Sequence, residues 1–367
     1  MILHRNPSKI GSVNLPVILS RILALPILTL VFLIHRVAFS LDIILFPRLK
    51  KVLIKKPLFI VGLPRSGTTT THRLMASHSE LYTSMPLWEL LFAPALCQKY
   101  VIWGLYRADA AIGGPAIKTI NWVQAKLAAK LDDIHPTGLT DPEEDYLGLF
   151  PFDGCFLRVL MFPFAKSTWA LGVFSSLPKA KRQKLLTSYR GLVQRHLVFR
   201  GEHKRLLSKN PSFTTWVSDL AKTFPDADFV GMHRDLEQVV PSQLSSVHSG
   251  LQIFGYSAKD PRIVEKFVTL LKLYEEEIKE YTSNLGSRML PLDFKAIASA
   301  PENAVEALYE HFQLPKRNTL DAARFSDLLA ETKAYRSKHS YALGEFGLEI
   351  QDLRAPVTRP LLNNAKA

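Results

Sequence analysis

A short apolar segment followed by a glycine-containing turn constrains this chain more than any other feature of its sequence. Residues 58–61 read LFIV, and Gly62 and Gly67 follow with four residues between them. An apolar run that passes through such a turn into a helical pattern predicts a strand–loop–helix unit. The spacing is close to a Walker A loop, whose backbone N–H groups face phosphate. Thr68 stands where that loop has its lysine, and Arg65 supplies a cation inside the loop instead.

Two interpretations of this loop are open. Two glycines alone are typical of an ordinary strand-to-helix turn. The preceding strand, the internal Arg65 and four consecutive threonines, 68–71, favour a phosphate-binding loop, since N–H groups at the start of a helix attract anions.

Short apolar segments alternate with amphipathic segments along much of the remaining chain. Strands are expected at 205–208, 227–232 and 289–292, and helices at about 66–77, 212–224, 264–278 and 305–312. Ser212 is expected to cap the second of these helices. Buried strands that alternate with helices predict an α/β fold with a parallel sheet flanked by helices. The mainly helical stretch of about 86–197 predicts a large insertion that covers a site.

Positively charged residues come directly after two of the predicted strands. Lys209 follows one strand and Arg234 follows another, as the Gly62 turn follows the first. The carboxyl ends of parallel strands share one edge of a sheet, where ligands bind, so these residues are expected to meet in one crevice. The strand at 227–232 continues into His233 rather than into an acidic residue of the Walker B kind. We therefore expect phosphate charge to be balanced by side-chain cations, without a metal.

Arg234 has two interpretations. Ser242 lies eight residues later, just over two helical turns, so both side chains could bind one phosphate. Alternatively, Arg234 pairs with Asp235 or Glu237 and Ser242 faces solvent. The first interpretation gains weight only beside the Gly62 loop.

The first 56 residues differ in composition from the rest of the chain. Residues 15–34 carry only the charge of Arg21, and a second apolar run, 37–46, is interrupted by Asp42. Twenty helical residues could cross the ~30 Å hydrocarbon core of a membrane. Because of Pro26 and the second run, a kinked helix or a helical hairpin lying in the membrane interface is equally compatible.

A cleaved signal peptide is a third interpretation of this segment, from Ala38 and Ser40, but Arg36 just before them argues against it.

The charge around this segment predicts its orientation in the membrane. Basic residues near a membrane segment resist translocation, so the C-terminal side is expected on the cytoplasmic face. Two cations precede the first apolar run and six follow it: Arg5 and Lys9, against Arg36, Arg48, Lys50, Lys51, Lys55 and Lys56.

The overall charge narrows the possible partners. Lysine and arginine total 46 against 33 acidic residues, a net charge of +13, which favours a polyanionic partner. The cations are dispersed and no aromatic-basic module is evident, so nucleic acid is not expected. Cys97 and Cys155 cannot form a disulfide framework and lack metal-ligand spacing, which favours a reducing compartment.

Several ordered motifs, taken together, resemble a known family. They are PRSGTT at 64–69, PLWELLF at 86–92, KNP at 209–211, HRD at 233–235 with Ser242, LPLDF before Pro301, and KHSYALGEFGL at 338–348. From about 57 to 348 the chain resembles sulfotransferases of the bacterial type, with distant similarity to tyrosylprotein sulfotransferases. The resemblance implies a P-loop-like α/β fold. It also implies transfer of a sulfonate group to a hydroxyl or amine from 3′-phosphoadenosine 5′-phosphosulfate (PAPS), without a metal.

The resemblance also implies roles for individual residues. The loop residues Arg65, Ser66, Gly67, Thr68 and Thr69 would bind the 5′-phosphosulfate. Arg234 and Ser242 would bind the 3′-phosphate, and Lys209 would hydrogen-bond the bridging oxygen as it leaves.

The base that takes the acceptor proton is open at this stage. The resemblance points to Glu89, whose apolar neighbours would raise its pKa. Its position in a first helical turn gives an alternative, a favourable interaction with the helix dipole. His135 is a competing base. Residues 141–144, Asp-Pro-Glu-Glu, are expected to start a helix. Lys338 or His339 could contact the nucleotide.

These features predict a membrane-associated sulfotransferase. The expected division is a membrane-associated segment at 1–56, a sulfotransferase domain at 57–350 and a tail at 351–367. The acceptor is unknown, and a lipid-borne one fits the membrane segment. A P-loop nucleotide-dependent phosphoryl transferase is the alternative, although the missing Walker lysine and Mg²⁺-binding acid count against it.

Overall fold

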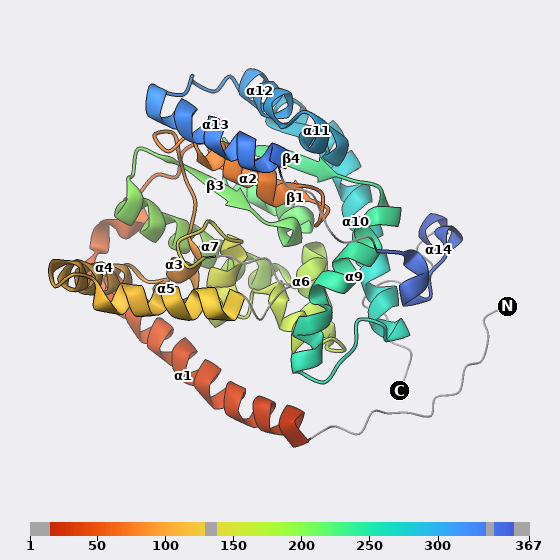
Figure 1. The fold of residues 1–367 in the computed structure, drawn as a ribbon, viewed down its shortest axis with the longest axis horizontal. Coiled ribbons are helices and arrows are strands. Elements are labelled where there is room, and N and C mark those ends of the chain that lie inside the picture. Colours follow the sequence, from red (N-terminus) through yellow and green to blue (C-terminus); the bar gives the residue numbers. More distant parts are fainter. Residues whose placement is uncertain (1–14, 129–137, 335–340, 356–367) are drawn as a thin grey trace.

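Five parallel strands form the centre of the computed structural model, which describes residues 15–128, 138–334 and 341–355 (Figure 1). The order across the sheet is β2-β3-β1-β4-β5. The bounds are β1 Leu58–Gly62, β2 Tyr82–Thr83, β3 Arg205–Lys209, β4 Asp228–His233 and β5 Met289–Asp293. The predicted parallel α/β sheet is confirmed. Only the edge strand β2 was missed, because two residues show no periodicity.

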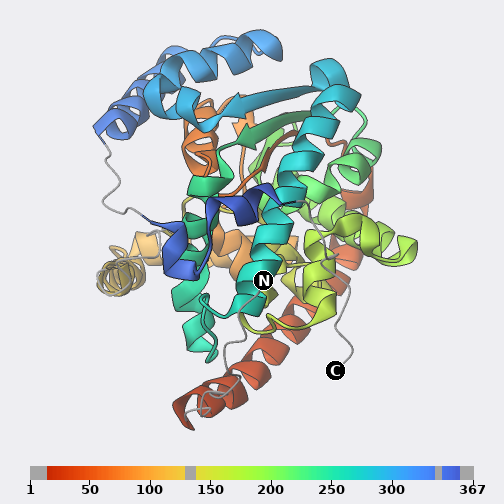
Figure 2. The ribbon, with the colours of Figure 1, turned by 90° about the vertical axis from the view of Figure 1, so that its right-hand side faces the viewer.

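Side chains of β1 alternate between two apolar layers. Phe59 and Val61 belong to one core cluster, while Leu58 and Ile60 belong to the other. The first cluster is completed by α7 (Lys179–Arg200), η5 (Pro211–Trp216), α8 (Val217–Thr223) and α10 (Pro261–Leu285). The second is completed by α2 (Thr68–Ala76), α11 (Phe294–Ser299), α12 (Pro301–His311) and α13 (Thr319–Ala334). Helices therefore cover both faces of the sheet, as Figure 2 shows from the side.

The segment between β2 and β3 is mainly helical in the residues described, as predicted. It contains α3 Leu87–Leu91, α4 Leu96–Ala111, α5 Pro115–Ala128, η2 Asp145–Phe152, η3 Phe156–Leu160, α6 Lys166–Gly172, η4 Phe174–Ser176 and α7. The remaining elements are η1 Pro47–Lys51, α9 Leu236–Ile253, η6 Gly286–Arg288, η7 Leu343–Phe346 and α14 Ile350–Arg354.

The predicted cap at Ser212 is wrong. The chain leaves β3 into the 3-10 turn η5, which begins at Pro211, so Ser212 lies inside the turn and Asn210 takes the cap position. The Asn210 side chain bonds Ser208 and Asp145 rather than capping the turn. The apolar face predicted for 212–224 is nevertheless buried.

The N-terminal apolar segment forms one helix, α1 (Leu15–Leu45), which continues through Pro26. The helical-hairpin alternative is therefore wrong. By length and composition, Pro26–Leu45 could cross a membrane. However, Asp42 is fully buried, accepts from Arg195 Nε at 2.7 Å, and accepts from the backbone N–H groups of Leu96 and Cys97 at 2.7 and 2.8 Å. The charge that interrupts the apolar run thus fastens α1 to α4 and α7.

At Gly62, strands β1 and β4 approach each other closely at the carboxyl edge of the sheet. Its φ is +117°, and a Cβ there would lie 2.2 Å from the Met232 carbonyl oxygen. We expect Gly62→Ala to lower the free energy of unfolding by about 2 kcal/mol or more, measured by chemical denaturation. Gly104→Ala is the control: it lies in α4 with no atom near its Cβ position, and should gain about 0.5–1 kcal/mol. Equal stabilities for both variants would contradict the close approach.

Candidate active site

A cavity of about 890 Å³ lies at the carboxyl edge of the sheet. The loop after β1, the end of β3 and the segment after β4 each contribute to it, through Arg65, Lys209 and Arg234. The predicted meeting of these three cations in one crevice is therefore observed. Thr68, Thr69 and Ser242 also line the cavity.

The loop after β1 turns sharply through two residues with positive φ, one arginine and one glycine. Arg65 has φ +60° and Gly67 has φ +83°, and a Cβ on Gly67 would lie 2.7 Å from Ile297 Cγ2. The Thr214 hydroxyl accepts from the Gly62 N–H at 2.8 Å and fixes the base of the loop. Ser66 is fully buried and donates to the Leu63 carbonyl, so its side chain shapes the loop.

Arg65, Arg234 and Ser242 form one hydrogen-bonded group. Arg65 Nε donates to Ser242 Oγ at 3.0 Å, and Arg234 Nη1 donates to the Arg65 carbonyl at 2.6 Å. Burial, together with the charge of Arg65, lowers the pKa of Arg234. The two guanidinium groups therefore repel one another, and an anion between them would relieve that repulsion.

The alternative ion pairs for Arg234 are not formed. Its Nε and Nη2 donate to Gln238 Oε1 at 3.0 Å. Asp235 pairs with Lys295 instead, and Glu237 with Arg354.

Lys209 lies buried between two carboxylates. Its Nζ is 3.0 Å from Glu144 Oε1 and 3.3 Å from Glu143 Oε1, and its exposed fraction is 5%. Burial alone would lower the pKa of Lys209, but Glu144 and Glu143 raise it, so the amine is charged. Burial raises the pKa of Glu144, against the opposing effect of Lys209.

The expectation that residues 141–144 start a helix is wrong. Pro142 forms a β-bridge with Pro86, and the Glu143 N–H donates to the Met85 carbonyl at 3.0 Å. This pairing holds the segment extended and turns Glu143 and Glu144 into the cavity. The following 3-10 turn begins only at Asp145, without a side-chain cap. A local pattern of a capping residue followed by proline cannot indicate this pairing, because the partner residue is distant in the sequence.

Glu89 lies outside the cavity lining in a buried charge cluster. Its carboxylate is fully buried and bonds Lys99 Nζ at 2.6 Å, His196 Nδ1 at 2.8 Å and Arg200 Nε at 2.7 Å. Burial alone would raise the pKa of Glu89, but His196, Lys99 and Arg200 hold it well below its ordinary value. The expected rise in pKa is therefore wrong. A role as base stays a prediction that this environment does not favour.

The other predicted residues fall outside the described structure. His135, Lys338 and His339 lie in 129–137 and 335–340, which the structure does not describe. Tyr341, just after the second of these gaps, lines the cavity.

One part of the cavity wall is apolar, which sequence reasoning missed. Six residues of η3 and α10 contribute to it: Phe156, Val159, Leu160, Phe267, Leu270 and Leu271. Apolar positions on α10 have the same spacing whether they face the sheet or a cavity, so no sequence signal separates the two.

Known proteins resemble the chain in sequence and in fold. The family described as "Sulfotransferase family" matches residues 57–147 and 169–318. Sulfotransferase STF9 from Mycobacterium avium is similar in fold, with a TM-score of 0.72 and 18% identity, over 89% of this chain and 81% of that one. Sulfotransferase STF1 from Mycobacterium tuberculosis H37Rv has a TM-score of 0.64 and 20% identity, over 88% and 82% of the two chains.

One curated relative gives a shorter match. A protein of Aquifex aeolicus (strain VF5), described as "Uncharacterized protein", is 34% identical over 125 residues. The match covers 30% of this chain and 15% of the relative's length.

The buried Glu89 cluster predicts a pH-dependent contribution to stability. At pH 7, Glu89→Gln should lower the free energy of unfolding by about 3–5 kcal/mol, because Lys99 and Arg200 lose their charge partner. The folded-state pKa of Glu89 is below its unfolded value of about 4.3, so this stability is present above that pH. It is lost as the pH falls further, and the difference between wild type and variant should narrow below about pH 4.

Chemical denaturation across this pH range measures the effect. Glu302→Gln is the matched control, since its pair with Lys333 is 3.5 Å apart and half-exposed, and it should change stability by less than about 1 kcal/mol. A Glu89→Gln variant as stable as this control at pH 7 would contradict the cluster's role.

Proposed function

Because the chain belongs to the sulfotransferase family, we propose that it transfers a sulfonate group from PAPS to a hydroxyl or amine of an acceptor. One observation carries the proposal: Arg65, Arg234 and Lys209 converge on one cavity from three neighbouring strands. PAPS supplies the sulfonate group when bound, and the chain supplies the charges that hold its phosphates.

The cations suit a molecule that carries two separate anionic groups. Arg65, Gly67, Thr68 and Thr69, on the loop and first turn of α2, would hold the 5′-phosphosulfate, with Ser66 shaping the loop. Arg234 and Ser242 would hold the 3′-phosphate. The hydrogen bonds Arg65–Ser242 and Arg234–Arg65 support this assignment, because they arrange both groups before a ligand binds.

Lys209 would act on the leaving group. Sulfonate transfer is an in-line displacement in which negative charge builds on the departing phosphate. A charged amine already buried at the end of β3 stabilises that charge without reorganising water. We propose no metal. A phosphoryl transferase is less well supported, because its lysine position is occupied by Thr68 and no acidic residue ends β4.

The apolar wall of the cavity supports an acceptor with a hydrocarbon part. Phe156, Val159 and Leu160 would contact such a chain, while the hydroxyl faces Lys209 and the acidic pair. Together with the exposed apolar face of α1, this supports a lipid-borne acceptor and a catalytic domain at the cytoplasmic face of a membrane.

Binding of the product nucleotide tests the donor assignment. In isothermal calorimetry with EDTA, the chain should bind adenosine 3′,5′-bisphosphate far more tightly than it binds ATP with Mg²⁺. Arg234→Ala should weaken bisphosphate binding about 10- to 100-fold, the value of a charge-assisted hydrogen bond. Arg107→Ala, on α4 outside the cavity, should leave it unchanged. Mg²⁺-dependent ATP binding with no response to the bisphosphate would refute the proposal.

A further inference from the structure

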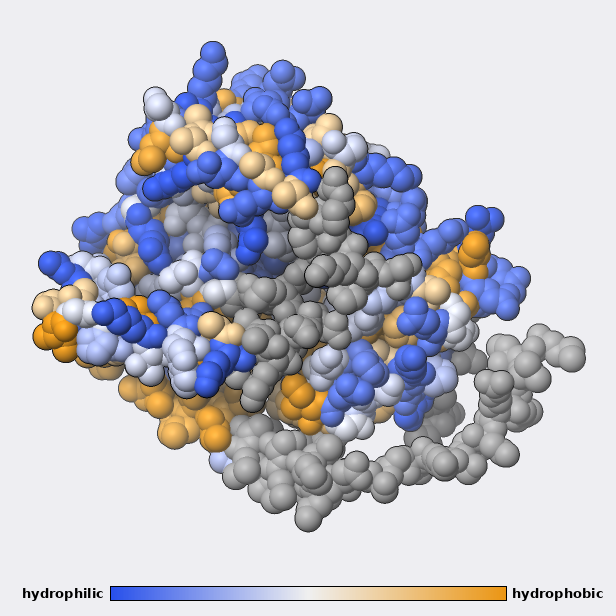
Figure 3. Space-filling model, viewed as in Figure 1, coloured by the Kyte–Doolittle hydropathy of each residue, from blue (hydrophilic) through white to orange (hydrophobic). Residues whose placement is uncertain are grey.

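Helices α1, α4 and α5 expose large apolar side chains. They lie on the side of the molecule away from α11, α12 and α13 (Figures 1 and 2). In Figure 3 the apolar side chains of α1 gather into a continuous patch along its outer face. We call the exposed faces of α1, α4 and α5 the α1–α4–α5 surface. Its large exposed residues, each 46–76% exposed, include Leu30, Ile34, Ile44, Trp103, Tyr106 and Trp122.

Cations surround the apolar residues. Trp122 lies under Lys126 Nζ at 4.0 Å, and Trp103 lies under Arg107 at 5.0 Å, which is typical of side chains that sit at a membrane interface. Of the acidic residues in 26–56 and 96–126, Asp42 is buried and Asp109 accepts from N–H groups at the start of α5. The surface therefore presents apolar groups and positive charge together, which complements an anionic lipid bilayer.

Two contacts of α1 are incompatible with a helix that crosses the bilayer at Pro26–Leu45. Phe32 packs on Phe150 with ring centroids 5.0 Å apart, and the buried Asp42 binds Arg195 on α7. A membrane around this part of α1 would also have to surround α7, which is rich in lysine and arginine. Residues 15–31 would extend about 25 Å, less than the ~30 Å hydrocarbon core.

We propose that α1 lies in the plane of one membrane leaflet, with the α4–α5 pair as a second contact, instead of crossing the bilayer. This deepens the membrane part of the proposed function and leaves its chemistry unchanged. The position of α1 relative to the cavity is consistent with this proposal. The segment η2 lines the cavity at Tyr146 and ends on α1, where Phe152 packs on Phe39, and η3 then returns to the cavity wall.

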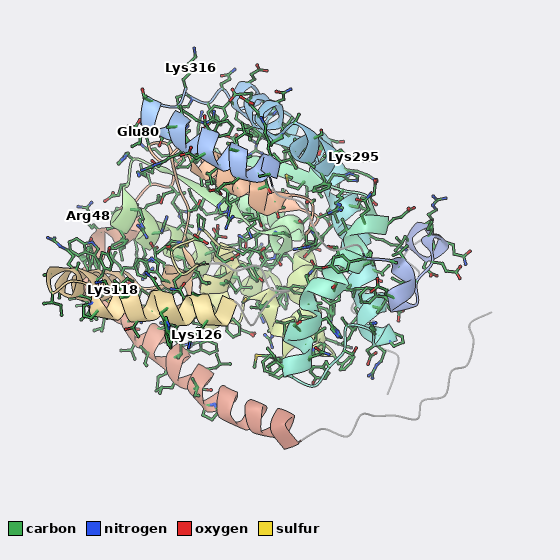
Figure 4. All side chains as sticks on the ribbon, in the orientation of Figure 1. Arg48, Glu80, Lys118, Lys126, Lys295 and Lys316 are labelled. Carbon is green, nitrogen blue, oxygen red and sulfur yellow. The ribbon has the colours of Figure 1, made fainter. Side chains whose placement is uncertain are left out.

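Vesicle sedimentation of the full chain tests the surface. The chain should bind vesicles of phosphatidylcholine mixed with phosphatidylglycerol more tightly than vesicles of phosphatidylcholine alone. Lys118→Glu with Lys126→Glu, both on α5 (Figure 4), should weaken binding to the anionic vesicles about 30-fold or more. Lys316→Glu is the matched control, because Lys316 extends from the opposite side of the molecule (Figure 4).

Protease accessibility distinguishes a helix α1 that lies on the membrane from one that crosses it. With a tag at the N-terminus, both tag and catalytic domain should be cut in inverted membrane vesicles and both protected in right-side-out vesicles. A tag and domain on opposite sides would overturn the proposal in favour of a crossing helix. An equal effect of the α5 and Lys316 variants, or no vesicle binding, would also overturn it. Bisphosphate binding would persist in each case, so these failures are distinct from failure of the proposed function.

A second inference rests on the acidic pair beside Lys209 and depends on the proposed function. Glu143 and Glu144 are the carboxylates that line the cavity next to this amine in the described structure. They differ in their surroundings. The Glu143 carboxylate accepts the backbone N–H of Glu144 at 2.9 Å and acts on His72 behind the loop.

Glu144 lies near buried side chains deeper in the cavity. Burial and the charge of Glu144 raise the pKa of Tyr274, which lines the cavity, and of the buried Cys155, while the charges of both glutamates act on Tyr146. It is thus the carboxylate between the leaving-group lysine and the apolar wall where the acceptor would bind. Burial raises the pKa of Glu144, so its carboxylate binds a proton more strongly, as a general base requires.

The geometry points to Glu144 as the general base. The acceptor hydroxyl gives its proton to a Glu144 carboxylate oxygen while the acceptor oxygen forms a bond to sulfur. The bond from sulfur to the bridging oxygen breaks, and its electron pair stays on the leaving phosphate beside the Lys209 ammonium group. When Lys209 turns to that phosphate, Glu144 loses a positive partner, so donor binding makes the carboxylate more basic.

Turnover with labelled PAPS and a membrane lipid extract tests the assignment. Glu144→Gln should lower the rate of sulfonated lipid formation about 10²- to 10⁴-fold, with bisphosphate affinity changed only a few-fold. Glu143→Gln is the matched control, since it removes the other carboxylate from Lys209, and its loss should stay below about tenfold. Lys209→Ala should lose about 10²- to 10³-fold, as for one transition-state donor.

Equal losses in Glu143→Gln and Glu144→Gln would mean that both carboxylates serve only as charge partners of Lys209, and would overturn the inference. A fully active Glu144→Gln chain would do the same. Either result leaves nucleotide binding intact, whereas loss of bisphosphate binding in the wild type would count against the proposed function itself.

Discussion

The rest of this structure depends on one constraint, which is that several positive charges lie in one cavity before any ligand binds. Arg65, Arg234 and Lys209 would repel one another, and each is partly or fully removed from water. The chain meets this cost in two ways. Lys209 is neutralised by Glu143 and Glu144, while the arginines bond neutral groups, the Ser242 hydroxyl, the Gln238 amide and a backbone carbonyl. The part proposed to bind the 3′-phosphate therefore keeps its positive charge, and the part proposed for chemistry is balanced until the donor binds.

The backbone carries much of this arrangement. Because Gly62 lets β1 approach the Met232 carbonyl closely, the loop leaves the sheet at a point where Arg65 reaches α9 and the segment after β4. Asp145 is buried and bonds Ser208, Asn210 and Tyr189, which ties the residues around Lys209 to α7. Burial raises the pKa of Asp145 to about 6, so these donors hold it where a carboxylate is not favoured on its own. Positioning of the lysine is thus shared between β3, η2 and α7.

Buried charges also join α1 to the insertion and join helices within the insertion to one another. Asp42 joins α1 to α4 and α7, and Glu89 joins α3 to the same two helices. Removing one partner from such a pair leaves an unpaired buried charge, so these contacts specify how the helices dock more than they add to stability. They explain why α1, although apolar enough to cross a membrane, is an integral part of the catalytic body from Phe32 onward. They also give the acidic residues in PLWELLF and in the apolar N-terminal run a structural use.

The sequence alone determined the strand–loop–helix unit, the parallel sheet and the three cations at its carboxyl edge. It could do so because period, glycine position and strand order are local, and because parallel strands share an edge. Only the tertiary structure decided which carboxylate meets Lys209. The sequence interpretations of Glu89 and of residues 141–144 rest on their immediate neighbours. The pairing of Pro86 with Pro142, across more than fifty residues, instead turns Glu143 and Glu144 into the cavity. Burial of a charge depends on such distant partners, and no local pattern records them.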